Sequence, residues 1–217
     1  KLEITIVTDE DTYKKFKPLG FINYKLIEPE LGNKRNGEQW NQLERCHAYD
    51  HSPYDTTILM DCDYFCYTDN LLTYTNIEDD FLLHDKIHDI TGKGTYDFRE
   101  NSIIPMLWAT VIVFKKTDRA KRIFDMVKYI KQHYHYFCKL YRIDFPNYRN
   151  DYAFTMAINQ VNGNTQQTFL PGKIPTLPAL AKIIEVKETG IVFEYDDKIN
   201  EIENQDVHLI SKEIFNV

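Results

Sequence analysis

Continuous apolar runs are separated by polar stretches along this chain. Residues 1–8 (KLEITIVT) alternate charged and apolar positions before they become apolar, while 56–60 (TTILM) and 107–114 (LWATVIVF) are apolar or β-branched throughout. Runs of this length are typical of strands covered on both faces, as in parallel sheets. Each of these segments is therefore predicted to be a strand, with shorter strands over 24–27 and 81–83.

A helical period follows the strand at 107–114. Apolar side chains recur every four and three residues in a stripe of Ile123, Val127, Ile130, Tyr134, Phe137 and Tyr141. This spacing predicts one long amphipathic helix, and Thr117 or Asp118 is placed to cap its start. A second helix is expected over 151–161, with Asn150 as its cap.

The order of these elements indicates the fold class. Strands and helices alternate in the N-terminal part, which implies β-α-β units, whereas short strands near 183–186, 190–194 and 207–210 follow the last helix. The polar segment 84–101, with two glycines, is expected to be a loop. The prediction is an α/β protein with a GT-A-like (Rossmann-like) mixed, mostly parallel sheet flanked by helices, in a single domain over residues 1–217.

Composition and charge narrow the classes of protein that fit. Hydrophobic residues make up 43% and charged residues 27% of the 217, a globular balance, and no apolar run approaches the roughly 20 residues that span a bilayer. The net charge of −7 argues against a protein whose whole surface binds nucleic acid. No signal peptide is recognised, and the cysteines, Cys46, Cys62, Cys66 and Cys138, are expected to be reduced, packed thiols of a cytoplasmic protein.

Two carboxylates follow the apolar run 56–60. Asp61 and Asp63 are spaced i, i+2 at the expected carboxyl end of a strand, where open α/β sheets bind ligands. Two acids held close together require a counter-charge, and Mg²⁺ or Mn²⁺ commonly bridges such carboxylates to phosphates. The pattern predicts a metal–phosphate site. The alternative is that Asp61 and Asp63 cap a turn or the next helix.

The stretch 52–71 (SPYDTTILMDCDYFCYTDNL) resembles the core of GT-A type glycosyltransferases, in particular the glycogenin and galactosyltransferase-like group. Those proteins have an apolar strand, a DxD motif, an aromatic or apolar segment and a second turn that contains Asp. The resemblance implies a metal-dependent enzyme with a nucleoside-diphosphate sugar as donor. Asp63 would be the main ligand of Mn²⁺ or Mg²⁺, and Asp61 would contact the ribose or share the metal. The resemblance also implies transfer with retention.

Further segments match the order of this group along the chain. Arg45 corresponds to a basic residue that reaches the donor, and Trp108 lies in a segment resembling the strand that lines the acceptor side. Asp151, in the sequence YRNDY, resembles the acid that opens a helix near the reacting sugar. In VHLISK, His208 resembles the histidine that completes the metal shell, and Lys212 resembles the lysine that touches the diphosphate.

These assignments have structural alternatives. Arg45 also fits a helix-packing role, and Trp108 fits the core. Asp151 is an acid in the first turn of a helix, where the helix dipole favours it. His208 also fits an exposed strand end.

Two departures from the group concern the base and the metal. The opening strand–turn–helix of the group, which holds the base, has no counterpart ahead of Lys1, so this unit is expected to be absent or to lie outside the sequence. Thr8 and Asp9 are then the candidates for a position near the base. No glycine follows His208, as one does in glycogenin-like proteins.

Two other functions stay open. A haloacid-dehalogenase-like phosphatase also carries DxD after a buried strand, but that family places Thr or Val where this chain has Phe65. A non-catalytic module that binds nucleotide sugars has the same sequence features. For a transferase, the acceptor is a glycan, a protein or a modified DNA base, and the oligomeric state is left open.

Overall fold

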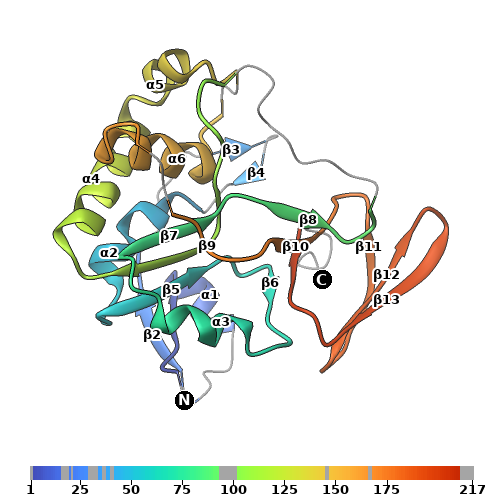
Figure 1. Cartoon of the computed structure of the whole chain (residues 1–217). Coiled ribbons are helices and arrows are strands. Elements are labelled where there is room, and N and C mark those ends of the chain that lie inside the picture. The colour runs from blue at the N-terminus through green and yellow to red at the C-terminus, as the bar shows by residue number, and fades with distance from the viewer. Residues whose placement is uncertain are drawn as a thin grey trace.

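The computed structural model describes residues 2–15, 20, 22–28, 34–35, 38–39, 42–92, 102–144, 147–165 and 168–210. The described helices are α1 (Glu10–Lys15), α2 (Ala48–His51), α3 (Asn70–Thr73), α4 (Asp118–Gln132), α5 (Tyr134–Tyr141) and α6 (Asn150–Val161), with 3₁₀ segments at Gln42–His47 and Tyr74–Asn76. Figure 1 shows α4, α5 and α6 gathered on one side of the molecule and the C-terminal strands projecting on the other.

The strands form several small sheets. They are β1 (Thr5–Thr8), β2 (Asn23–Leu26), β3 (Lys34–Arg35), β4 (Glu38–Gln39), β5 (Thr56–Met60), β6 (Tyr64–Phe65), β7 (Phe81–His84), β8 (Ile87–Asp89), β9 (Trp108–Lys115), β10 (Ile174–Leu177), β11 (Lys182–Val186), β12 (Gly190–Tyr195), β13 (Lys198–Glu203) and β14 (Val207–Leu209). The larger sheets have the orders β5-β9-β7, β6-β14-β10-β8 and β11-β12-β13. The remaining pairs are β1-β2 and β3-β4.

Parallel and antiparallel pairing both occur, as predicted, but the strands are divided among separate sheets, and the pairing is not mostly parallel. Within the described residues, parallel pairing joins β1 to β2, β8 to β10 and β10 to β14. β5 and β7 both pair antiparallel with β9. The prediction of parallel pairing failed because a continuous apolar run indicates only that both faces of a strand are buried. A central strand of an antiparallel sheet can be buried on both faces as well, and its sequence is then equally apolar.

β9 is such a central strand. Its side chains Ile112 and Phe114 belong to the main core on the side of α4 and α6, whereas Val111 and Val113 belong to a smaller core with Tyr74 of the 3₁₀ segment. Phe124 of α4 joins the sheet to the helices, because its ring packs edge-on against the rings of Phe81, Phe114 and Phe154 at centroid distances of 4.9 to 5.5 Å.

The long helix predicted after β9 is two helices. α4 ends at Gln132 and α5 begins at Tyr134, because His133 leaves helical geometry at φ −118° and ψ 29°. The apolar stripe stays in the core across this break. The Thr117 hydroxyl accepts a hydrogen bond from the amide of Ala120, which confirms it as the cap of α4.

The predicted cap of the last helix is wrong by one position. α6 already includes Asn150, and Arg149 takes the cap position without a side-chain cap bond. The Asn150 side chain is used differently, because its Oδ1 accepts a hydrogen bond from the Tyr148 hydroxyl at 3.2 Å. The predicted loop 84–101 is also partly wrong, since its first part forms the end of β7 and all of β8, while 93–101 lie outside the described residues.

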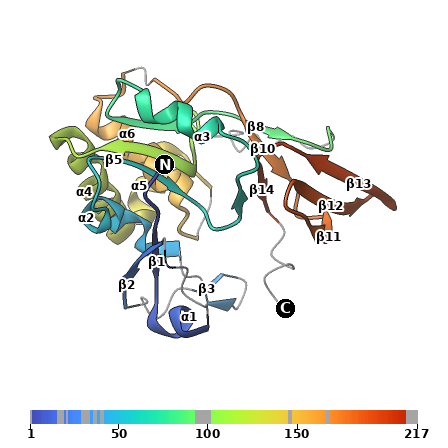
Figure 2. The ribbon, with the colours of Figure 1, turned by 90° about the horizontal axis from the view of Figure 1, so that it is seen from below.

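The N-terminal β1-α1-β2 segment is a β-α-β unit, as the alternation of elements predicts. β1 and β2 pair in parallel from Thr5 with Asn23 to Thr8 with Leu26. Figure 2 shows this blue unit on the lower side of the molecule, away from the C-terminal strands. The Thr5 and Tyr54 hydroxyls, 2.6 Å apart, link it to the segment that leads into β5.

The C-terminal strands enclose a second core. Residues of β12, β13 and β14 meet there with Phe65 of β6 and Tyr67. Gly190 begins β12 where it pairs with β13, and a Cβ on this residue would lie 1.8 Å from the carbonyl oxygen of Ile202. Only glycine fits this approach of the two strands.

His84, on β7, is expected to make the fold sensitive to acid. Its side chain is 3% exposed, and burial lowers the pKa of the imidazole from 6.5 to about 4. The unfolded chain therefore binds more protons between these values, and the imidazole destabilises the fold as the pH falls from 6.5 towards 4. We expect this group to remove about 2 kcal/mol of unfolding free energy between pH 7 and 4.5. Denaturant titrations at several pH values should show that His84→Gln loses less unfolding free energy between pH 7 and 4.5 than wild type does. The control Tyr74→Phe should lose as much as wild type. Equal losses in wild type and His84→Gln would contradict the prediction.

Candidate metal centre

Asp61, Asp63 and His208 meet at the junction of two sheets. One ligand atom from each lies within 4.8 Å of the others. The amide of Asp61 donates to the carbonyl of Thr110 at 3.0 Å, which extends the pairing of β5 with β9. The carbonyl of Asp63 accepts from the amide of Leu209 at 2.9 Å, which ties the next part of the turn to β14. The turn thus connects the two sheets, with the carboxylate of Asp61 beside the β5-β9 pair and that of Asp63 beside β14.

His208 reaches this turn through strand pairing. β14 pairs antiparallel with β6, and His208 lies opposite Tyr64, the residue after Asp63. The His208 Nε2 atom is 3.5 Å from Asp63 Oδ1. Burial lowers the pKa of His208, with the charges of Asp61 and Asp151 acting in the opposite direction. A lowered pKa favours neutral imidazole, which is the form that binds metals.

Arg45 lies beneath the cluster and holds Asp61. Its guanidinium donates to Asp61 Oδ1 and to the carbonyl oxygen of Ala109 on β9. Both side chains of the ion pair are largely buried, 9% and 12% exposed. The resemblance predicts that Arg45 reaches the donor, and in the structure its contacts orient Asp61.

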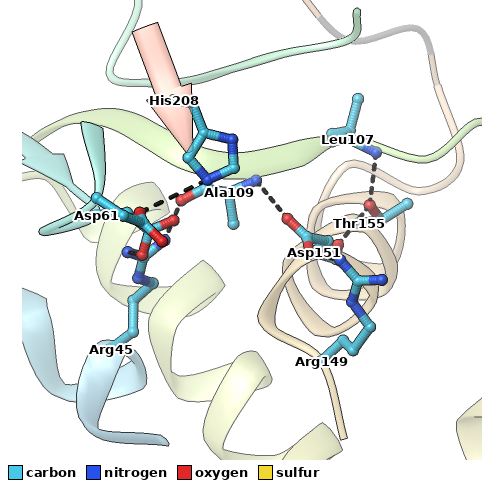
Figure 3. A network of polar contacts seen from close by, with 9 residues as sticks. Arg45, Asp61, Leu107, Ala109, Arg149, Asp151, Thr155 and His208 are labelled. Carbon is cyan, nitrogen blue, oxygen red and sulfur yellow. Dashed lines mark hydrogen bonds and ion pairs between the residues drawn. The ribbon is translucent and has the colours of Figure 1, made fainter. Parts of the chain in front are cut away.

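A second ion pair lies on the other side of His208. Asp151 Oδ1 accepts from the amide of Ala109 at 2.9 Å, and its Oδ2 accepts from Arg149 at 2.9 Å. The backbone of Ala109 therefore contacts both pairs, because its N–H donates to Asp151 and its carbonyl oxygen accepts from Arg45. Figure 3 shows His208 above and between the Arg45–Asp61 and Arg149–Asp151 pairs.

The cluster fits a hard divalent cation. Ligand atoms of an octahedral ion at about 2.1 Å lie roughly 3 to 4 Å from one another, which this spacing allows. Asp61 and Asp63 bring two carboxylates, of which Asp61 pairs with Arg45, and a divalent cation would add positive charge between the two acids. Oxygen ligands with one imidazole suit Mn²⁺ and also Mg²⁺. Asp61, Asp63 and His208 would hold the ion.

The other predicted site residues lie elsewhere or in the core. Asp9 caps α1, where its carboxylate accepts from the amide and the hydroxyl of Thr12 at 2.7 and 2.8 Å. Thr8 ends β1 beside it. Trp108 is 7% exposed within the main core, which favours packing over stacking on a sugar. Lys212 lies outside the described residues.

Sequence reasoning assigned no role to two residues that the structure brings to this region. Arg149 directly precedes α6 and pairs with Asp151 two positions later, so its nearness in sequence was an available signal. Asp206 is buried two residues before His208 and binds the segment that follows Asp63. No local pattern marks this contact, because its partners are 139 and 138 residues apart in the sequence.

Comparison of the chain with protein-family models, with curated proteins and with solved structures finds no match. In the part of the chain that the structure describes, no helix has the length and apolar character of a membrane span. Function is therefore inferred from the chemistry of the cluster itself.

Proposed function

We propose that this protein is a metal-dependent glycosyltransferase. It moves a sugar from a nucleoside-diphosphate sugar to an acceptor hydroxyl, with retention of the anomeric configuration. The observation that carries the proposal is the meeting of Asp61, Asp63 and His208, whose ligand atoms lie within 4.8 Å of one another. Two carboxylates after a strand and a neutral imidazole form a donor set for the cation that accompanies a diphosphate.

The roles of the surrounding residues follow from their contacts. A divalent ion held by the cluster would neutralise the charge that develops on the diphosphate leaving group. Arg45, which donates to Asp61 Oδ1, would hold this carboxylate in place for the ion. Asp151, fixed by the Ala109 amide and by Arg149, would orient a sugar or acceptor hydroxyl.

The transfer step needs no general base from the protein. The bond between the anomeric carbon and the diphosphate oxygen breaks, and the acceptor oxygen forms the new bond to that carbon. The proton of the acceptor hydroxyl passes to the departing diphosphate. Electrostatic stabilisation of that diphosphate is then the main contribution of the site.

Binding of metal and diphosphate tests the proposal most directly. We expect Mn²⁺ with a nucleoside diphosphate, at about a hundred times its dissociation constant, to add about 2.7 kcal/mol of stability. For a chain of this size that gain corresponds to a rise of about 5 °C or more in melting temperature. Thermal shift measurements over several nucleotides, with and without EDTA, give the readout. No shift with any nucleotide would contradict the proposal.

Turnover separates the transferase from its alternatives. Mn²⁺-dependent hydrolysis or transfer from a panel of nucleotide sugars supports the enzyme. Binding without turnover over that panel would instead indicate a binding module. Hydrolysis of an aryl phosphate without action on nucleotide sugars would indicate a phosphatase.

A further inference from the structure

Asp206 joins two segments that lie far apart in the sequence. Its Oδ1 atom accepts hydrogen bonds from the backbone amides of Tyr67 and Thr68, at 2.7 and 2.8 Å. The carboxylate is buried, since Asp206 is 2% exposed. Bonds from N–H groups to a carboxylate are shorter and stronger than neutral ones, so this contact is a firm tie between the segment after Asp63 and the start of β14.

The tie lies at the end of the strand pair that brings the cluster together. Phe65 of β6 pairs with Val207, the residue after Asp206. Beyond Phe65 the ladder of β6 with β14 stops, and the Asp206 side chain supplies the next two hydrogen bonds to the same segment. Because this pair also sets His208 beside Asp63, a loss of its register would separate the two ligands.

A second contact fixes the same segment to the C-terminal sheet. The Tyr67 hydroxyl donates to the carbonyl oxygen of Gly190 at 3.0 Å. The Tyr67 ring stacks on Phe65, with centroids 6.3 Å apart and planes at 17°. The segment after Asp63 is therefore held from two directions by residues near the C-terminus.

We propose that Asp206 is the positioning residue of the metal centre. It holds the segment of Asp63 and the strand of His208 in one arrangement, so that these ligands are in place before the ion binds. This inference rests on the proposed function for the metal. Residues that orient metal ligands from behind typically change metal affinity 10–100-fold when they are replaced.

Three variants separate geometry from charge. Asp206→Asn keeps an oxygen that accepts the two amides and loses the charge, whereas Asp206→Glu keeps the charge and displaces it by one methylene. Asp206→Ala removes both. We expect Mn²⁺ affinity, measured by calorimetry with the metal alone, to fall at least about tenfold in the Ala and Glu variants and to stay within about threefold of wild type in Asp206→Asn.

A metal-independent readout accompanies the calorimetry. Hydrogen exchange without metal is expected to be faster in Asp206→Ala and Asp206→Glu over residues 63–68 and 206–209, with the main core unchanged. Val127→Ala is the matched control, because it destabilises α4 in the main core, apart from the β6–β14 pair. This control is expected to keep the wild-type Mn²⁺ affinity and the slow exchange of the two segments.

The outcomes distinguish this inference from the proposed function. Wild-type Mn²⁺ affinity in Asp206→Ala or Asp206→Glu overturns the positioning role and leaves the metal centre intact. If wild type binds no Mn²⁺, the proposed metal function fails. Hydrogen exchange alone then tests whether Asp206 holds the two segments together. Faster exchange confined to the two segments then supports it, and exchange that is unchanged or faster throughout overturns it. If the Ala variant does not fold, the contrast between the Asn and Glu variants gives the same decision.

Discussion

Replacement of Asp63 by asparagine is expected to lower sugar transfer about a thousandfold, equivalent to about 4 kcal/mol of transition-state stabilisation. Asp63 is 2% exposed and shares the cluster with Asp61 and His208. An amide in its place removes one of the two charges that would hold the ion, while the shape of the side chain is kept. The loss should therefore appear in metal binding as well as in turnover.

The backbone of the turn should be unaffected by this change. The carbonyl of Asp63, not its side chain, accepts the hydrogen bond from Leu209 that ties the turn to β14. With EDTA, we expect Asp63→Asn to melt no lower than wild type, because a buried carboxylate beside another acid costs free energy when no cation is bound. The rise in melting temperature that we expect Mn²⁺ and a nucleoside diphosphate to produce in wild type should be lost.

The measurement is a transfer or hydrolysis assay with the best nucleotide sugar, together with thermal shift. Asp79→Asn is the matched control, because it removes the same charge from an exposed position before β7. That control should keep wild-type turnover. Full turnover in Asp63→Asn, or a metal-induced shift that persists in it, would rule out Asp63 as a ligand.

Local patterns predicted the strand that carries the motif. The apolar run 56–60 coincides with β5 as observed, because a β-branched stretch bounded by Pro53 and Asp61 leaves little freedom in its limits. The cap at Thr117 was also predictable, since a hydroxyl placed just before an amphipathic stripe satisfies free amides at a helix start.

Long-range arrangement was accessible only in part. The resemblance ordered Asp61, Asp151 and His208 along the chain, but their approach depends on β14 pairing with β6 and on the Ala109 peptide, which no local spacing encodes. β5 was predicted to pair in parallel but pairs antiparallel with β9, because an apolar run does not determine the direction of the neighbouring strand. Asp206 acts across more than a hundred residues, and its sequence neighbourhood resembles an ordinary turn before a strand.

Replacement of Asp151 by asparagine is expected to lower kcat about a hundredfold, the size of effect that a small misplacement of a reacting hydroxyl produces. The Asn oxygen can still accept from the Ala109 amide, which at present bonds Asp151 Oδ1 at 2.9 Å. The other oxygen becomes an amide nitrogen, which cannot accept a hydroxyl hydrogen bond and loses its attraction to Arg149. Asp61, Asp63 and His208 keep their places, so Mn²⁺ and donor affinity should stay close to wild type.

Thr155→Val tests whether the effect of Asp151 is merely structural. Thr155 joins α6 to β9 at the same junction, because its Oγ1 accepts from the Leu107 amide at 2.8 Å and donates to the Asp151 carbonyl at 2.7 Å. Its replacement leaves a buried amide without that partner and should cost about 1–3 kcal/mol of stability. Assayed well below both melting temperatures, Thr155→Val should keep kcat while Asp151→Asn loses it. Equal loss in the two variants would mean that Asp151 only joins the helix to the strand, and wild-type kcat in Asp151→Asn would remove it from the reaction.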